Sequence, residues 1–278
     1  MNTYSLPRND TTRQVSLLPV AVRNASDFMT KRARELVMRL IERTGSEEPP
    51  FLPEELAPFQ GIKRIERTDL GELNALLLRL HDGYVIKVNS SHSQVRQNYS
   101  CAHEIAHTFL HELERQSSSH SAEFRTLNLN ISNKDKERLC EAAAAELLTP
   151  EPIFKKYLSR FGVSVSSIEW LAHIFRVSIP TAAIRIEEVS EEPCIALRWQ
   201  PQQKARSRGF RLVWPYHILQ SKYVRNPSCL LKAYESNDIV KSSKSFEIHG
   251  IRKRCYMESK SFGRSNMRYV ISLVFPER

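Results

Sequence analysis

Apolar residues recur at three- and four-residue steps over much of the first 190 residues, and this spacing predicts a series of amphipathic helices. The first predicted helix begins at Ser26, a favourable N-cap, and ends near Gly45. Residues 1–25 show no sustained period, and we expect them to form a loosely ordered arm. Four prolines between positions 49 and 58 indicate a turn-rich connection to the next element.

A β-hairpin and two long helices are predicted next. Residues 73–80 and 84–88 are largely apolar runs on either side of an Asp-Gly turn. Residues 91–115 contain neither Gly nor Pro and carry an apolar stripe typical of one helix. A second helix is predicted from its N-cap at Ser132 to Pro150, which ends it. Because Glu146 lies about 180° round that helix from Glu137, we expect Glu146 to face water.

Residues 161–190 resemble a helix-turn-helix, in which Ser178 caps the second helix and Pro180 lies in its first turn. That second helix is mainly apolar apart from Thr181 and Arg185. Since base reading requires several polar side chains that reach the groove, we favour packing over sequence-specific DNA recognition for this helix.

The pattern changes after Val189 to short runs rich in β-branched and aromatic residues, at 194–199, 209–214, 246–256 and 267–275. The predicted fold class is therefore α+β, with a mainly helical domain that holds a small sheet, a helix-turn-helix-like linker and a C-terminal α+β domain. The predicted segments are an arm at 1–25, the helical domain at 26–160, the linker at 161–190 and the β-rich domain at 191–278.

Positive charge is concentrated in the last 78 residues, which hold 16 lysines and arginines against 5 acidic residues in a chain of net charge +10. Aromatic residues are interleaved with these basic residues, as on surfaces that bind single-stranded nucleic acid. An ordinary solubilising surface over core aromatics is the equal alternative. The candidate nucleic-acid-binding residues are Arg206, Arg208, Arg211, Arg252, Lys253, Arg254, Arg264 and Arg268.

The cysteines and the hydropathy bear on the cellular compartment. The five cysteines are odd in number and show no C-x-x-C spacing, so neither a disulfide framework nor a cysteine zinc site is indicated. No apolar run approaches the roughly 18 residues that a membrane helix needs. We therefore expect a cytoplasmic protein without a membrane partner, and we expect Cys101 and Cys140 to act as small buried hydrophobic residues.

The segment HEIAH, residues 103–107, lies within the predicted helix at 91–115. An H-E-x-x-H placed on a helix directs two imidazoles from one face, so that His103 and His107 can bind one Zn²⁺ with Glu104 beside it. His111 lies about 12 Å along the helix from His103, which is too far for the same ion. The metzincin pattern is excluded because Leu110 stands where that pattern has Gly.

A third metal ligand is expected from the helix at 132–150. Glu137 and Glu141 lie four residues apart on one face of it. Glu137 is the favoured ligand, with Glu141 orienting one imidazole through a hydrogen bond, although Glu141 could itself be the ligand. An ordinary solvated pair of carboxylates is the alternative, because this spacing is common on helices.

The segments VRQNYSCAHEIAHTFLH and ERLCEAAAAELLTP together resemble the ImmA/IrrE family of bacterial metallo-endopeptidases, over roughly residues 31–187. The resemblance implies zinc held by His103, His107 and Glu137, with Glu104 as general base. Glu141 replaces the usual Asn of the family, and Thr149 replaces the usual Met before Pro150. Family members typically cleave a helix-turn-helix repressor or antitoxin encoded beside them, which switches on a stress or defence operon.

Two functions follow as hypotheses. The first is a site-specific zinc endopeptidase, with manganese as an alternative metal in the cell and single-stranded DNA or another polyanion as a candidate activator. Its substrate would be a helix-turn-helix repressor. An edge strand just before the metal helix, at 84–88, would bind the substrate by strand addition, with a plain structural hairpin as the equal alternative. The second is a DNA-binding transcriptional regulator with a structural metal site, which the presence of Glu104 disfavours.

Overall fold

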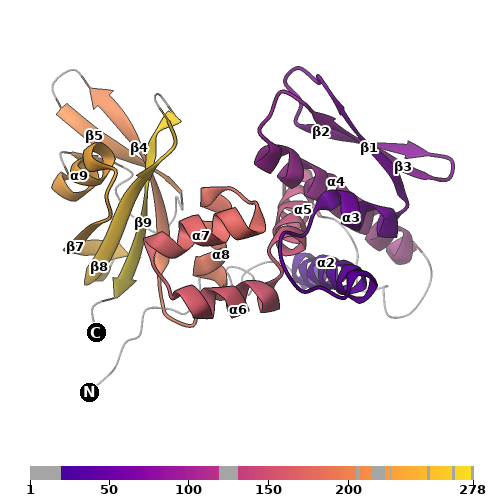
Figure 1. Ribbon diagram of the computed structural model, residues 1–278, viewed down its shortest axis with the longest axis horizontal. Helices are drawn as coiled ribbons and strands as arrows, with labels where there is room; N and C mark the ends of the chain where they lie inside the picture. The colour runs from indigo at the N-terminus through magenta and orange to yellow at the C-terminus, as the bar shows by residue number, and fades with distance from the viewer. Residues whose placement is uncertain are drawn as a thin grey trace. The chain divides into compact units, whose positions relative to one another are not determined.

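The computed structural model describes residues 20–118, 131–204, 207–214, 223–225, 227–248, 251–264 and 267–276 (Figure 1). Contacts divide these residues into two compact units. One unit holds the described residues up to 154 together with 173–178, and the other holds 155–172 and the described residues from 179 onwards. Helices and sheets occur in both, which confirms the predicted α+β class.

The first unit is built on three long helices, α2 (Val20–Thr44), α4 (Gln94–Ser118) and α5 (Asn133–Leu148). Both α2 and α4 contact α5, and the short helices α3 (Pro53–Leu56) and η1 (Ala57–Gln60) follow α2. Helix α2 begins six residues before the predicted start at Ser26. Its apolar stripe already includes the buried Val22 and Ala25, so residues 20–25 belong to the helix rather than to an arm.

Helix α5 is buried on the face opposite Glu137, and the prediction that Glu146 faces water is wrong. The side chain of Glu146 is 3% exposed, and its Oε1 accepts hydrogen bonds from Arg34 Nε at 2.8 Å and from the Glu151 N–H at 3.1 Å. Arg34 also binds the Glu151 carboxylate at 2.5 Å. The helical periodicity placed Glu146 on the correct face, but α2 covers that face and supplies the cation.

A three-stranded sheet joins β1 (Ile62–Thr68), β3 (Gly83–Asn89) and β2 (Ala75–Leu80) in that order. Strands β2 and β3 form the predicted antiparallel hairpin, whereas β1 pairs with β3 in parallel. The strand just before α4 is therefore central, and the expectation that residues 84–88 form an edge strand is wrong. The edge strand of the hairpin is β2, because β1 occupies the other side of β3.

The second unit contains a six-stranded antiparallel sheet of order β6-β5-β4-β9-β8-β7. Its strands are β4 (Ile195–Lys204), β5 (Ser207–Trp214), β6 (Tyr223–Arg225), β7 (Val240–Ile248), β8 (Ile251–Phe262) and β9 (Tyr269–Pro276). Helix α9 (Ser228–Ser236) contributes Leu230 and Ala233 to a buried core with Trp199 and Phe210.

Helices α6 (Glu151–Phe161), α7 (Val165–Phe175) and α8 (Ile179–Val189) include the helix-turn-helix-like pair α7 and α8. Arg185 of α8 is buried and pairs with Glu188 at 3.0 Å. Glu187 accepts a hydrogen bond from the Ala196 N–H of β4 at 3.0 Å. These contacts give α8 a packing role. Within the part of the chain that the structure describes, every helix is too short or too polar to cross a membrane.

Candidate metal centre

Helix α4 places His103 and His107 at the margin of its buried face. Ala102, Ile105 and Ala106 are fully buried and anchor the helix, while both imidazoles and Glu104 remain partly exposed. The two imidazole rings lie edge to face with centroids 4.9 Å apart. Their four-residue spacing on a rigid helix therefore brings both rings to one point beside the core.

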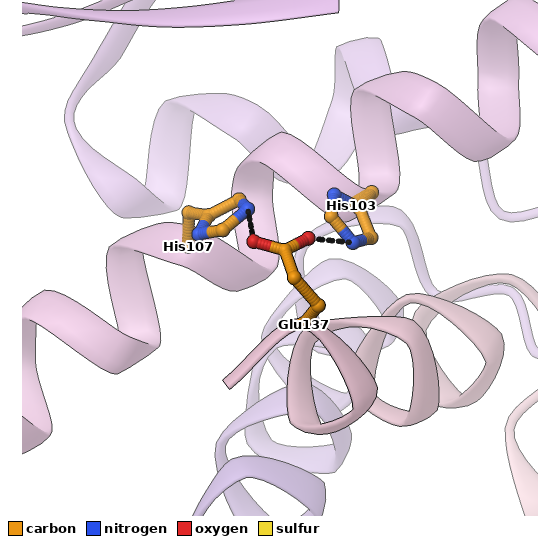
Figure 2. Close-up of side chains that lie close together, drawn as sticks. All are labelled: His103, His107 and Glu137. Atoms are coloured by element: carbon orange, nitrogen blue, oxygen red, sulfur yellow. Dashed lines mark ion pairs between the residues drawn. The ribbon is translucent and has the colours of Figure 1, made fainter. Parts of the chain in front are cut away.

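Helix α5 supplies the third donor, and its alanines allow it to approach α4 closely. Figure 2 shows the Glu137 carboxylate between the two imidazoles. Its Oε2 lies 3.5 Å from His103 Nε2, and its Oε1 lies 3.9 Å from His107 Nε2. One ligand atom from each of the three residues lies within 4.8 Å of the others.

This donor set fits a zinc ion. Tetrahedral zinc with bonds of about 2.0–2.2 Å separates its ligand atoms by about 3.3–3.6 Å. The separations between the Glu137 oxygens and the two Nε2 atoms are close to that value and are longer than good N–H···O hydrogen bonds. Two imidazoles and one carboxylate also form a common catalytic zinc set, with a fourth position for water.

Burial adjusts the protonation of these groups. It lowers the pKa of His103 and of His107, which favours the neutral imidazoles that metals bind, although Glu137 opposes the effect. Burial, with the nearby Glu137 carboxylate, raises the pKa of Glu104 to about 7, while a hydrogen bond from the Leu77 backbone N–H opposes this rise. Glu104 is thus placed near neutrality, where a proton-transfer group is most effective.

The contact with Leu77 connects Glu104 to the edge strand β2. The Asn89 N–H donates to the Asn74 carbonyl at 2.9 Å, so Asn74 and Asn89 form a hydrogen-bonded pair of the antiparallel ladder. Hydrogen-bonded and non-hydrogen-bonded pairs alternate along such a ladder, so the next pair, Ala75 and Val88, is not hydrogen-bonded. By this alternation, the backbone groups of Ala75, Leu77 and Arg79 point away from β3. A row of backbone donors and acceptors therefore lies along the strand beside Glu104.

Three other residues near the site, Glu141, His111 and Cys140, lie outside the triad. Glu141 is exposed, and within the described chain no hydrogen bond joins it to an imidazole. His111 is half-buried and its Nδ1 lies 3.5 Å from the Tyr84 hydroxyl. Cys140 was missed as a site residue, although its sulfur lies 3.6 Å from His107 Nδ1. Its position three residues after Glu137 was the available signal.

The predicted basic surface is divided between two ends of the large sheet. One end of the β8–β9 ladder is the pair Phe262 and Tyr269, and the other end is the pair Cys255 and Pro276, about 23 Å away. Arg264 and Arg268 lie at the Phe262 end, and Arg254 lies at the Cys255 end. Arg211 is exposed on β5 and pairs in register with Gln200. Arg268 donates to Ser261 at 2.8 Å and lies over the Tyr234 ring. Arg206 lies outside the described residues, as do the side chains of Arg208, Arg252 and Lys253.

Comparison with known proteins places a family match over the site. Residues 61–187 match the family described as the IrrE N-terminal-like domain. The radiation response metalloprotease IrrE of Deinococcus radiodurans is 33% identical over 127 residues, which are 45% of this chain and 37% of that protein. The chain therefore matches little more than a third of that relative's length. A solved structure described as a Mycobacterium tuberculosis transcriptional regulator has a similar fold, with a TM-score of 0.56 and 16% identity over 93% of this chain and 81% of that one.

Proposed function

Residues 61–187 belong to the ImmA/IrrE family of metallopeptidases, as the two site helices implied, and from this premise we propose that the protein is a zinc endopeptidase. The observation that carries the proposal is the convergence of His103, His107 and Glu137, with the Glu104 carboxyl beside them and bonded to an edge strand. A purely structural metal site needs no such carboxyl group.

Each residue then has a chemical role. The two imidazoles and Glu137 would hold zinc, which supplies a Lewis acid that lowers the pKa of water and polarises a peptide carbonyl. Glu104 accepts a proton from the attacking water and passes it to the leaving amine nitrogen. Burial of Glu104 supports the second transfer, because a carboxyl group with a pKa near 7 returns its proton readily.

The proposed substrate is a helix-turn-helix repressor or antitoxin, whose loss would derepress a stress or defence operon, such as a response to DNA damage or to phage. The family resemblance supports this substrate class. The outward backbone groups of β2 also support an extended peptide as the bound form, because a peptide strand can pair with them and pass Glu104.

The test is incubation of the zinc-loaded protein with the helix-turn-helix protein encoded beside its gene, followed by mass spectrometry. We expect one new pair of fragments, no cleavage after chelation, and recovery on adding zinc or manganese. A single-stranded oligonucleotide is added at about 50 and 200 mM salt, and activation by a polyanion should fade as salt rises. If cleavage is the same with and without the oligonucleotide, activation by a polyanion is rejected and the peptidase assignment stands.

Pairing of substrate with β2 predicts a selective effect of Ala75→Pro. Proline is tolerated at the first residue of an edge strand, yet here it removes an outward N–H. Loss of one hydrogen bond, worth about 0.5–1.5 kcal/mol, should reduce kcat/KM roughly 2- to 12-fold, mainly through KM. The matched variant Ala75→Ser keeps the N–H and should remain near wild type. Equal activity of the two variants would show that substrate does not bond there.

The alternative function, a DNA-binding transcriptional regulator with a structural metal, has less support. The transcriptional-regulator structure shares only the fold at 16% identity. Arg185, a candidate base-reading side chain of α8, is buried in an ion pair. Tight DNA binding by a protein that cleaves nothing would favour this alternative.

A further inference from the structure

The second nitrogen of each imidazole matters at a metal site. When Nε2 binds a metal, Nδ1 carries the ring proton, and the group that accepts this proton fixes the orientation of the ring. In His107, Nε2 is the nitrogen that faces Glu137, at 3.9 Å from Oε1. The partner of the remaining nitrogen, Nδ1, is the sulfur of Cys140 at 3.6 Å, a distance suited to a hydrogen bond with the large sulfur atom.

Cys140 is held firmly in this position. It lies on α5 three residues after Glu137, so one turn of helix supplies both a metal ligand and a contact to a second ligand. The residue is fully buried, and water therefore does not compete for His107 Nδ1 from that side. The nearby His103 differs, because within the described chain no hydrogen bond to its Nδ1 is present.

We infer that Cys140 is a positioning residue of the metal centre: its sulfur accepts the Nδ1–H of His107 and keeps the Nε2 lone pair directed toward Glu137 and the metal. The inference rests on the proposed zinc site. A thiol can also donate to an unprotonated Nδ1, so it accommodates His107 with or without metal. A carboxylate in that place could only accept. Cys140 therefore orients the ring without adding negative charge to the site.

The test compares Cys140→Ala, which removes the hydrogen-bonding atom, with Cys140→Ser, which keeps a donor and acceptor. Zinc affinity is measured by competition with a chromophoric chelator, and the Nδ1 proton of His107 is observed by NMR in the zinc-loaded protein. We expect Cys140→Ala to weaken zinc binding roughly tenfold and Cys140→Ser to recover most of that loss. The Nδ1 proton resonance should shift in Cys140→Ser and exchange faster with water in Cys140→Ala.

A matched control is Cys101→Ala. Cys101 is also a buried thiol, but it lies on α4, and its removal should leave zinc affinity unchanged. Thermal unfolding of the metal-free variants distinguishes a positioning role from a purely structural one. If Cys140 only positions His107, its replacement should lower the zinc affinity while changing the unfolding temperature of the metal-free protein little. Wild-type affinity in Cys140→Ala, or equal losses in the Ala and Ser variants, would overturn the role of Cys140 while leaving the zinc site intact. A wild-type protein that binds no zinc would overturn both.

Discussion

Glu104→Gln should leave zinc in place and reduce kcat by about 10²- to 10⁴-fold. Glutamine has nearly the same shape and can still accept the hydrogen bond from the Leu77 N–H, so the surroundings of the site should persist. It cannot accept a proton from water at neutral pH, and the proton transfer to the leaving amine is lost with it. The measurement is single-turnover cleavage with the zinc content of each sample determined in parallel.

Glu104→Asp is the useful companion variant, because it keeps a carboxylate but draws it back by one methylene. We expect intermediate activity, since general base catalysis depends on reach as well as on protonation. Full turnover by zinc-loaded Glu104→Gln would remove Glu104 from the chemistry and return the centre to a structural role.

Glu137→Gln should release the metal. This substitution replaces the only anionic donor of the set with a weak amide ligand, and we expect zinc affinity to fall by more than about 100-fold, with cleavage lost at stoichiometric zinc. Isothermal titration with zinc measures the effect directly.

Glu141→Gln provides the matched comparison, because Glu141 lies on the same helix four residues later but is exposed and outside the donor cluster. It should bind zinc within a few-fold of wild type. Loss of zinc from Glu141→Gln, with retention by Glu137→Gln, would reverse the ligand assignment that the sequence left open.

The elements with strong local patterns could be predicted from the sequence. The helix around HEIAH, the alanine-rich helix and the Asp-Gly hairpin all have periods or turn residues that act within a few positions. The sequence favoured Glu137 over Glu141 as the ligand but could not exclude Glu141, because both lie on one stripe. Only the packing of α5 on α4 decides which carboxylate meets the imidazoles.

Features that depend on a distant partner were predicted least well. Glu146 is buried because α2 covers it, and β3 is central because β1 pairs with it in parallel. The sequence suggested one basic surface over the last 78 positions, but the register of β8 and β9 places Arg254 about 23 Å from the end of the sheet that holds Arg264 and Arg268. In each case, long-range pairing rather than local preference set the outcome.

Helix α2 belongs to the same compact unit as the metal centre. Arg34 binds Glu146 on the rear face of α5, and Arg32 binds Glu112 on α4 at 2.9 Å, so α2 is tied to both helices that carry metal ligands. The family match begins at residue 61, after α2, although the resemblance seen in the sequence reached back to about residue 31. The matched segment therefore contains every proposed ligand, while α2, which lies before it, adds ion pairs to both of the helices that carry those ligands.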